Sequence, residues 1–503
     1  MDIAPGFLER ITSSEKNEDI LLRLRSDHLE ALSIMEEDDE NETHFELFEL
    51  REGDDFGWLG YFIGQCTSLT QLHIDHVPED ADQINEFLRG LNRNRSIEDL
   101  EITDDLGDGM LEELSDFFHY NRNIYCLHID TCDIGYESAG NLASILRDAP
   151  LARLDLSQNE LCNEGFDMIV TAASSMQSQI ESLRVNYNYL SQVACTKLGT
   201  LLELGALNKL KELGLIFNEI DDNSLQTLSA GLVNNTTLES LSLSGNESIT
   251  ADGLRSLIPF LQSDGCSLSE IFFYYNNFGD TGAAALADGL AKNKSLKKLW
   301  FDPSDCGMTS TGWQSFAKVL CDTSSIDNTY QSNHTIELIG ESCDKGSPVN
   351  QVHKRVRALL RMNQNGNSKE VAKCKIFLNH RDFDVKPLFE WGLKCLPLIA
   401  TWFRNMHGCD VLPSTSTHFS KLSAGKLSAV YKFIRGMPAL TAVSHWQQVV
   451  ANAQSKRRRL DLGSGRSRLY HEDEEEAAWF RLGGRPRSEG GSANLVRGSK
   501  RMR

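Results

Sequence analysis

The stretch LARLDLSQNEL, residues 151–161, carries leucine at its first, fourth, sixth and eleventh positions and asparagine at its ninth. The same frame recurs along the chain, and its first apolar position falls at Leu69, Ile97, Ile124, Leu151, Ile180, Leu210, Leu238, Leu268 and Leu296. The intervals between these positions are 27 to 30 residues long. Agreement over so many successive units predicts a repeat architecture.

Each position of the frame has a physical role. The fourth and sixth positions alternate with polar residues, as expected for a short strand with one buried face. The asparagine at the ninth position turns the chain, and its amide can satisfy backbone groups inside the stack. It is Asn159, Asn188, Asn218, Asn246 and Asn276 in five units. The second half of a unit, such as residues 280–293, has the apolar spacing of a helix.

A strand followed by a true helix in about 28 residues resembles the ribonuclease-inhibitor-like class of leucine-rich repeats. This resemblance implies an α/β horseshoe solenoid, with parallel strands on the concave side and helices on the convex side. Because no single repeat buries its own core, both ends need caps. We therefore predict an N-terminal cap over residues 1–43, the solenoid over 44–345, a helical C-terminal cap over 346–445 and a disordered basic tail over 446–503.

The N-terminal cap carries a degenerate frame at Leu29, Leu32 and Ile34. The acidic run EEDDE, residues 36–40, then breaks that frame. We expect the regular repeats to restart at HFELFEL, residues 44–50.

Residues 324–336, SSIDNTYQSNHTI, interrupt the frame at its other end. If Ile326 takes the first position, Thr329 and Gln331 fall at core positions, where burial without partners costs on the order of 1–3 kcal/mol each. The alternative starts the frame ten residues later, at HTIELI, residues 334–339. The added surface loop costs under about 1 kcal/mol. We therefore predict HTIELI as the last strand, preceded by a loop.

Beyond this point the pattern becomes helical. Residues 351–363 carry apolar residues on one side, and a second helix should span 368–380 with Ser368 as its N-cap. The runs TYQSNHTIELIG, ALLRMN, KEVAKCKI and YKFIRGMPAL, within residues 324–440, resemble leucine-rich-repeat proteins of diatoms and related algae. That resemblance implies the architecture and no particular activity.

Charge divides the chain into two parts. The net charge of −22 combines a balance of +16 over residues 346–503 with −38 over residues 1–345. This split favours two surfaces with different partners, or one surface that binds the other. The twelve cysteines show no paired spacing, which fits free thiols in a reducing compartment. With no secretory signal and no apolar run of 18 residues, we expect a cytoplasmic or nuclear protein with no membrane contact.

The sequence contains no signature of an enzyme. P-loop, G-x-G-x-x-G, H-E-x-x-H, G-x-S-x-G and kinase motifs are missing from it. Cys126 and His128 would face the same side of a strand, but without further ligands nearby a chance pairing is favoured over a zinc site. We predict a non-enzymatic protein with no cofactor, no metal and no small-molecule substrate.

The frame also predicts which side chains face outward on the concave side, because alternate strand residues point out. In the early repeats these are mainly acidic: Asp75, His76, Glu98, Asp99, Glu101, Asp104 and Asp130. In the later repeats they are aromatic: Tyr187, Phe217, Phe272, Tyr274, Tyr275, Trp300 and, in the interrupted unit, Tyr330. Exposed aromatic residues resemble a binding hot spot, and the acidic half would steer a basic protein partner. Alternatively, the end-piece or the loop before HTIELI folds over the aromatic residues.

The basic tail allows three interpretations. Lys456, Arg457, Arg458 and Arg459 form a short basic run that could act as a nuclear-import signal. The same run could contact nucleic acid or an acidic protein, and it is the only route to nucleic acid that we expect. The tail could also fold back onto the acidic concave face and hold it closed.

The leading hypothesis is an interaction scaffold that binds a protein through the concave surface. The repeats also resemble those of the Ran GTPase-activating proteins, which carry a long acidic tail where this chain is basic overall, so a regulator of a small GTPase is the alternative. A third hypothesis, innate-immune-type sensing, rests on the repeats of NOD-like receptors. Those receptors carry an ATPase module, and the sequence has no such signature.

Overall fold

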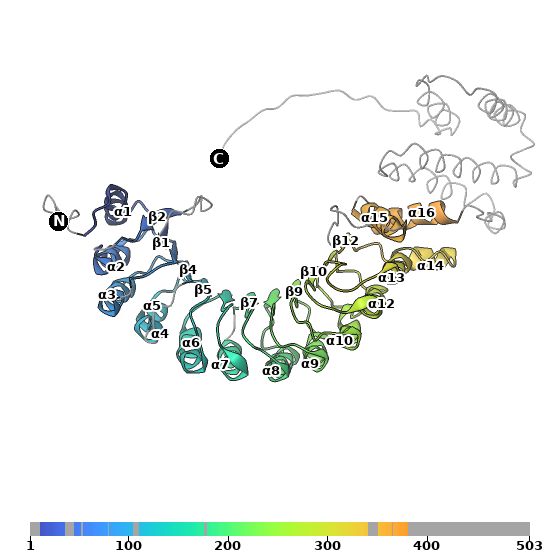
Figure 1. Cartoon of the computed structure of the whole chain (residues 1–503), viewed down its shortest axis with the longest axis horizontal. Helices are drawn as coiled ribbons and strands as arrows, with labels where there is room; N and C mark the ends of the chain where they lie inside the picture. The colour runs from blue at the N-terminus through green and yellow to red at the C-terminus, as the bar shows by residue number, and fades with distance from the viewer. Residues whose placement is uncertain are drawn as a thin grey trace, which may run out of the picture. The chain divides into compact units, whose positions relative to one another are not determined.

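The strands of the computed structural model stack side by side in one parallel sheet of twelve, β12-β11-β10-β9-β8-β7-β6-β5-β4-β3-β1-β2. The structure describes residues 11–35, 45–51, 54–78, 80–103, 110–175, 179–340, 351–364 and 366–380. All of them belong to one unit, residues 1–429. Within that unit the strands line the inner side of a curved stack and the helices line its outer side (Figure 1). The fold is therefore an α/β leucine-rich-repeat solenoid.

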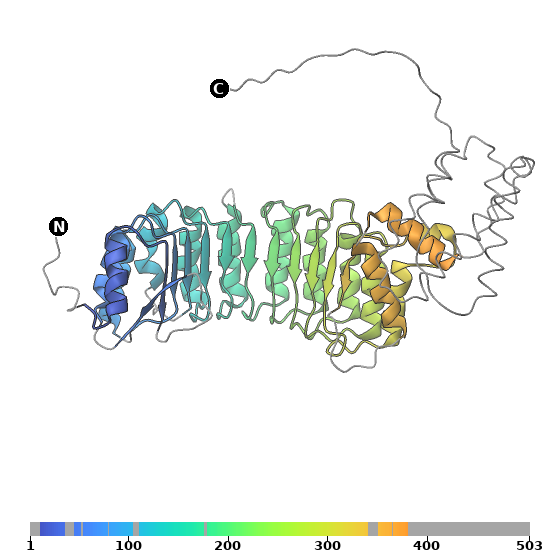
Figure 2. The same ribbon diagram turned by 90° about the horizontal axis from the view of Figure 1, so that it is seen from above.

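Each repeat contributes a strand of two to five residues and a helix. The strands are β1 Ala31–Met35, β2 Glu46–Glu49, β3 Gln71–Ile74, β4 Asp99–Ile102, β5 Cys126–Ile129, β6 Arg153–Asp155, β7 Ser182–Arg184, β8 Glu212–Gly214, β9 Ser240–Ser242, β10 Glu270–Phe272, β11 Lys298–Trp300 and β12 Leu338–Ile339. The helices are α1 Glu15–Arg25, α2 Phe56–Gln65, α3 Ala81–Leu91, α4 Met110–Glu113, α5 Ser115–Tyr120, α6 Tyr136–Asp148, α7 Cys162–Ser175, α8 Gln192–Glu203, α9 Asp222–Leu232, α10 Ala251–Ser256, α11 Ile258–Leu261, α12 Gly279–Leu290, α13 Ser310–Leu320, α14 Ile326–Gln331, α15 Gln351–Gln364 and α16 Ser368–Asn379. Seen from above, the strands form a continuous row (Figure 2).

The apolar frame positions form the core between these layers. All nine predicted first positions, from Leu69 to Leu296, are buried, with exposed fractions of 5% or less. The fourth positions pair across neighbouring strands, as in Leu72 with Leu100 and Leu100 with Leu127. This register confirms the predicted frame, because each leucine packs on its equivalent in the next repeat.

The ninth-position asparagines hold consecutive repeats together, and Asn246 shows how. Its Nδ2 donates to the backbone oxygens of Leu215, Leu243 and Ser244 at 2.9, 2.9 and 3.2 Å. Its Oδ1 accepts from the backbone N–H groups of Asn218 and Ile220, both at 3.2 Å. One buried side chain thus bonds five backbone groups of two consecutive repeats.

A second set of asparagines stands three residues before the first position in five repeats, and it fixes the register of the last strand. Asn293 Oδ1 accepts from the N–H of Leu296 at 2.7 Å, and Asn333 Oδ1 accepts from that of Ile336 at 3.0 Å. Ile336 therefore occupies a first position, and β12 pairs with β11 in parallel. The prediction of HTIELI as the last strand is confirmed.

The segment before that strand is a helix, so the loop predicted there was wrong. In α14, Thr329 is buried, and its Oγ1 donates to the Asp322 carbonyl at 2.6 Å and contacts His380 Nε2 at 2.7 Å. The cost expected for burying this threonine disappears because these partners satisfy its hydroxyl. Gln331 stays exposed at the end of the helix.

Glycine allows some neighbouring helices to approach each other closely. An added Cβ on Gly231 of α9 would lie 2.1 Å from the backbone oxygen of Gly199 in α8. Gly90 of α3 has the same relation to Gly60 of α2, at 2.2 Å from its carbonyl carbon. A side chain at these positions would force the helices apart, so the glycines set the spacing of the outer layer.

The N-terminal edge of the sheet differs from the prediction. β3 pairs with β1, and β2 pairs with the other side of β1. HFELFEL therefore does not restart the regular series but forms the edge strand, while the degenerate frame at Leu32 and Ile34 forms the true neighbour of β3.

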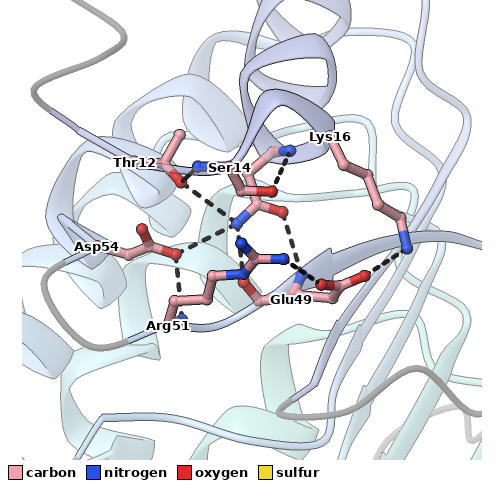
Figure 3. A network of polar contacts seen from close by, with 7 residues as sticks. Thr12, Ser14, Lys16, Glu49, Arg51 and Asp54 are labelled. Atoms are coloured by element: carbon pink, nitrogen blue, oxygen red, sulfur yellow. Dashed lines mark hydrogen bonds and ion pairs between the residues drawn. The ribbon is translucent and has the colours of Figure 1, made fainter.

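Helix α1 closes this edge through a polar network (Figure 3). Asn17 is fully buried, and its Nδ2 donates to the Glu49 carbonyl at 2.8 Å while its Oδ1 accepts from the Glu49 N–H at 3.2 Å. The same amide donates to Asp54 Oδ2 at 3.2 Å. Lys16 and Arg51 each bind one oxygen of the Glu49 carboxylate. One side-chain amide thereby occupies the outer backbone groups of β2, which limits edge-to-edge pairing.

At the other end, α15 packs on α13 and α16 covers α14 (Figure 1). The N-cap of α16 is Asn367, whose Oδ1 accepts from the N–H of Glu370 at 3.1 Å, and not Ser368 as predicted. Residues 381–503, which include most of the predicted C-terminal cap and the whole basic tail, lie outside the described residues.

A fully buried lysine joins α16 to the last repeat. Lys375 Nζ donates to the carbonyls of Leu320 and Asn333 at 2.7 and 3.0 Å, and to His334 Nδ1 at 3.0 Å. Burial lowers the pKa of this ammonium to about 7. Burial and then the neighbouring Lys375 lower the pKa of His334 to about 4.

Within the described ranges, eight cysteines are free thiols: Cys66, Cys126, Cys132, Cys162, Cys195, Cys266, Cys306 and Cys321. Cys374 is disulfide-bonded, which departs from the expectation that every thiol is free. None of the described helices has both the length and the apolar character that a membrane span requires.

Candidate functional site

Three aromatic side chains follow three of four consecutive strands, at the same edge of the sheet. Tyr187, Phe217 and Tyr275 take the eighth frame position, in the loops that leave β7, β8 and β10. We call these three residues the aromatic row. Tyr187 and Tyr275 have exposed fractions of 46% and 57%, and Phe217 is half-buried between them.

The rings of the aromatic row contact each other across four repeats. Tyr187 and Phe217 stack with centroids 4.7 Å apart, and Phe217 lies 5.8 Å from Tyr275. The intervening repeat carries Gly245 at the eighth position, where an added Cβ would lie 2.5 Å from the Phe217 ring. Glycine therefore leaves the space that lets Phe217 reach Tyr275 over the repeat between them.

The aromatic row sits on a strained backbone. The φ angles of Tyr187, Phe217 and Tyr275 are 53°, 48° and 53°, in the left-handed region. Bulky residues rarely adopt this conformation, which costs about 1–3 kcal/mol each. Gly245 takes the same conformation at φ 71° without that penalty. Thr131 and Gln158 have the same positive φ in earlier repeats, so the conformation belongs to the turn of each repeat, and in this row the turn carries large rings.

Phe272 and Trp300 form a second aromatic group, on the concave face of the sheet itself. They face each other across β10 and β11, and their rings are nearly parallel with centroids 5.9 Å apart. Trp300 Nε1 donates to Glu270 Oε2 at 3.1 Å, and Lys298 binds Oε1 of the same carboxylate at 2.8 Å. Burial would raise the pKa of Glu270, but these two hydrogen bonds lower it. The pair is thus held rigidly in place.

The centre of the concave face is internally neutralised. Arg184 on β7 donates twice to Glu212 Oε1, at 2.9 and 2.7 Å, and lies 3.6 Å from Asp155 Oδ2. Gly214 makes room for this arginine, since an added Cβ would lie 3.2 Å from its side chain. A partner would have to break these pairs to use the charges, so the centre offers little binding energy.

The predicted acidic residues of the early repeats are less strongly paired. Glu98 is exposed and Glu101 half-buried, and neither forms an ion pair within the described part of the chain. Asp130 Oδ2 accepts from Gln158 at 3.0 Å, whereas its Oδ1 is buried with no partner among the described residues. Burial raises the pKa of Asp130. Among the described residues, no hydrogen bond, ion pair or ring contact joins these residues to the aromatic row.

Cys126 and His128 do meet, with Sγ 3.2 Å from Nε2. Burial and the nearby Asp99 raise the pKa of the Cys126 thiol to about 12, so it is not poised as a nucleophile. Among the described residues no group of three or more His, Cys, Asp and Glu side chains could hold a metal ion.

Of the two remaining predicted aromatic residues, Tyr274 stays a prediction and Tyr330 lies outside the sheet. Tyr274 is half-buried, and its backbone lies in the inter-repeat ladder, accepting from the N–H of Gly245 at 2.7 Å. Tyr330 is exposed but belongs to α14, so its assignment to the concave sheet was wrong. The import candidates Lys456 to Arg459 lie outside the described residues.

Sequence reasoning missed the glycines and the backbone conformation of the row. Gly245 and Gly214 stand at outward frame positions next to the large side chains of Phe217 and Arg184. Glycine at these positions was the signal in the sequence that space is left there for a neighbouring side chain. The positive φ of the eighth position recurs in six successive repeats, at Thr131, Gln158, Tyr187, Phe217, Gly245 and Tyr275. A single glycine among bulkier residues is a weak indication of that angle.

The frame, the parallel sheet and the outer helices together define a leucine-rich-repeat protein. A family model described as "Leucine Rich repeat" matches residues 234–257. The chain is 31% identical to ribonuclease inhibitor of Sus scrofa over 254 residues, 50% of this chain and 54% of that protein. Ribonuclease inhibitor of Mus musculus is 29% identical over 43% of this chain and 47% of its own length. Over these regions the chain is therefore similar to ribonuclease inhibitors.

NACHT, LRR and PYD domains-containing protein 12 of Mus musculus is 26% identical over 53% of this chain and 25% of its own length. The chain thus spans about half the length of the ribonuclease inhibitors and a quarter of that larger protein. Among solved structures, the leucine-rich-repeat protein LegL7 from Legionella pneumophila is 15% identical, with a TM-score of 0.34 over 59% of this chain and 89% of that one.

Proposed function

We propose that the chain is a non-enzymatic interaction scaffold that binds a protein partner through the concave side of its solenoid. The observation that carries this proposal is the aromatic row, in which Tyr187 and Tyr275 are exposed, Phe217 is half-buried between them, and all three have positive φ. Similarity to two ribonuclease inhibitors, proteins named for their action on another protein, supports it.

The physical argument rests on preorganisation. Aromatic side chains in a fixed conformation lose little entropy on binding and give the largest contributions per residue in interfaces. Stacking fixes the rings of the row, and hydrogen bonding to Glu270 fixes Trp300. The repeats before the row carry Thr131 and Gln158 at the same turn, so the turn itself does not require an aromatic side chain. A partner that covers the rings would explain why aromatic side chains stand at these positions.

Affinity capture from cells tests the proposal. Changing Tyr275 and Trp300 together to alanine removes one ring from each aromatic group, the exposed Tyr275 and the half-buried Trp300. Each such truncation is expected to cost about 2 kcal/mol, so the affinity for the partner should fall roughly 10²- to 10³-fold. Tyr330→Ala is the matched control, because Tyr330 is 52% exposed on α14.

The proposal predicts that the double variant loses partners that the wild type and Tyr330→Ala both retain. Circular dichroism should show the same helix content in all three proteins. If the double variant keeps every partner, the concave aromatic residues do not form the interface.

The GTPase-regulator alternative makes a different prediction. An activator would accelerate hydrolysis of GTP by a small GTPase in a single-turnover assay, whereas a scaffold leaves that rate unchanged. We place the scaffold first because the described site consists of stacked rings and internally paired charges. Cytoplasmic or nuclear localisation is also a proposal, and nuclear entry would depend on residues 456–459.

A further inference from the structure

The two edges of the solenoid carry opposite charges. Seven loops, from the one after β5 to the one after β11, connect a strand to the helix that follows it; we call this edge the strand-exit rim. These loops contain eight Asp or Glu residues and no Lys or Arg. The seven segments that lead into β5 to β11, on the opposite edge, contain six Lys or Arg and three Asp or Glu.

Helix termini account for only part of this asymmetry. Seven helices begin at the strand-exit rim, and each N-terminus acts as roughly +0.5 elementary charge, so acidic residues there are favourable for folding. Together the helices supply about +3.5 charges, against eight carboxylates in the loops. The rim therefore remains negative after the helix dipoles are counted.

The aromatic row lies along this rim. Tyr187, Phe217 and Tyr275 all stand in strand-exit loops. Glu219 follows Phe217 by two residues, and Glu247 follows Gly245 by two residues. Both carboxylates are exposed and form no ion pair with any described residue. Exposed rings and unpaired carboxylates are therefore interleaved on one edge.

We propose that the partner docks an extended Lys- or Arg-rich segment along the strand-exit rim, with cationic groups against the rings of Tyr187 and Tyr275. This inference rests on the proposed function and names the chemistry of the partner. Aromatic rings attract cations placed over their faces, and Arg does so more often than Lys. Neighbouring carboxylates add attraction over distances of about 10 Å at 0.1 M salt.

Charge complementarity selects this occupant over others. A nucleic acid or an acidic peptide would be repelled by a rim with no Lys or Arg to neutralise its charge. A purely apolar segment would gain from the rings but nothing from the carboxylates. An extended basic segment uses both features, and it can follow a row that crosses four repeats, from β7 to β10.

Fluorescence anisotropy with a defined probe tests the proposal on the full chain. The probe is a labelled 12-residue peptide of alternating Arg and Gly, with a Glu–Gly peptide of the same length as its counterpart. Two charge variants carry the same change in net charge: Glu219→Gln with Glu247→Gln on the rim, and Glu239→Gln with Asp264→Gln on the opposite edge. Glu239 and Asp264 are also exposed.

The expected result is that the rim variant binds the Arg–Gly peptide about fivefold more weakly, while the opposite-edge variant stays within about twofold of wild type. Tyr187→Ala with Tyr275→Ala should also weaken binding, and the Glu–Gly peptide should not bind. If the two charge variants lose the same affinity for the Arg–Gly peptide, net charge alone explains the effect and the proposal is overturned. An unchanged affinity of the ring variant would overturn it as well.

The peptide-binding test can fail without the failure of the proposed function. If capture of cellular partners depends on Tyr275 and Trp300 but the rim carboxylates have no effect on the Arg–Gly peptide, the scaffold stands and the basic-segment chemistry fails. If neither depends on the rings, both proposals fail.

Discussion

Replacing Asn246 with alanine should remove a strong connection between neighbouring repeats. The side chain makes five hydrogen bonds, at 2.9 to 3.2 Å, to backbone groups of its own repeat and of the one before it. Each contributes about 1 kcal/mol net, and buried groups left without partners cost about 1–3 kcal/mol. We expect a loss of about 3–5 kcal/mol, a large share of a typical domain stability of about 5–15 kcal/mol.

Asn276 provides the matched control, because it stands at the same frame position and is equally buried. Its Nδ2 donates to the Leu243 carbonyl at 2.9 Å, but its Oδ1 has no partner in the described part of the chain. The longer turn after Asn246 explains this: the Ile249 N–H bonds back to the Asn246 carbonyl instead of to the next asparagine. Asn276→Ala should therefore cost only about 1–2 kcal/mol.

Urea unfolding followed by circular dichroism measures both variants. Because repeat arrays can unfold in stages, amide hydrogen exchange of β8 and β9 should accompany it. We expect the midpoint to fall further for Asn246→Ala and protection to drop first around Leu215 and Leu243. Equal destabilisation by the two variants, or a loss below about 1.5 kcal/mol for Asn246→Ala, would refute the ladder argument.

Three further predictions follow the same logic. Gly231→Ala should destabilise the protein by about 1–3 kcal/mol, because the new methyl group meets the Gly199 carbonyl. Gly140→Ala in α6 should instead stabilise it by about 0.5–1 kcal/mol, because the nearest contact of the added Cβ lies at 3.9 Å. Thermal unfolding of the two variants checks that their effects have opposite signs. The pKa of His334 is lowered to about 4 in the folded protein, against 6.5 in the unfolded chain, so the unfolded chain binds the proton first as the pH falls. The stability of the region near α16 should therefore fall as the pH drops from about 6.5 to 4. Hydrogen exchange of α16 across that range measures this loss, and exchange rates that reveal no change in stability with pH would contradict the prediction. Changing residues 456–459 to alanine should abolish nuclear entry if they form an import signal, which fluorescence microscopy of a tagged chain can show against an Arg-to-Lys variant that keeps the charge.

The sequence was informative wherever one residue type had one physical role. The apolar frame located the strands from β3 to β11, because burial on one face leaves few choices at the fourth and sixth positions. It also identified the last strand, since leaving Thr329 without partners looked costly. The structure instead buries Thr329 in α14 and satisfies its hydroxyl there, using His380 from a distant helix, which no local pattern reveals.

The site was predicted in part for a similar reason. Alternation identified Phe272 and Trp300 as neighbours on one face, and the structure stacks them. The frame could not indicate that Tyr187, Phe217 and Tyr275 form a separate row, because that depends on the positive φ of the eighth position and on the space left by Gly245. Nor could it place β2 outside β1, since both strands carry the same apolar alternation.

On the proposed function, a partner covers the rings on the concave side of the solenoid and along the strand-exit rim. Hydrogen–deuterium exchange of the chain with and without a captured partner tests this most directly. New protection should appear in residues 185–191, 215–221 and 273–278 and in β10 and β11, with α6 to α9 on the outer side unchanged. Protection confined to the outer helices, with those loops exchanging as in the free protein, would contradict the account.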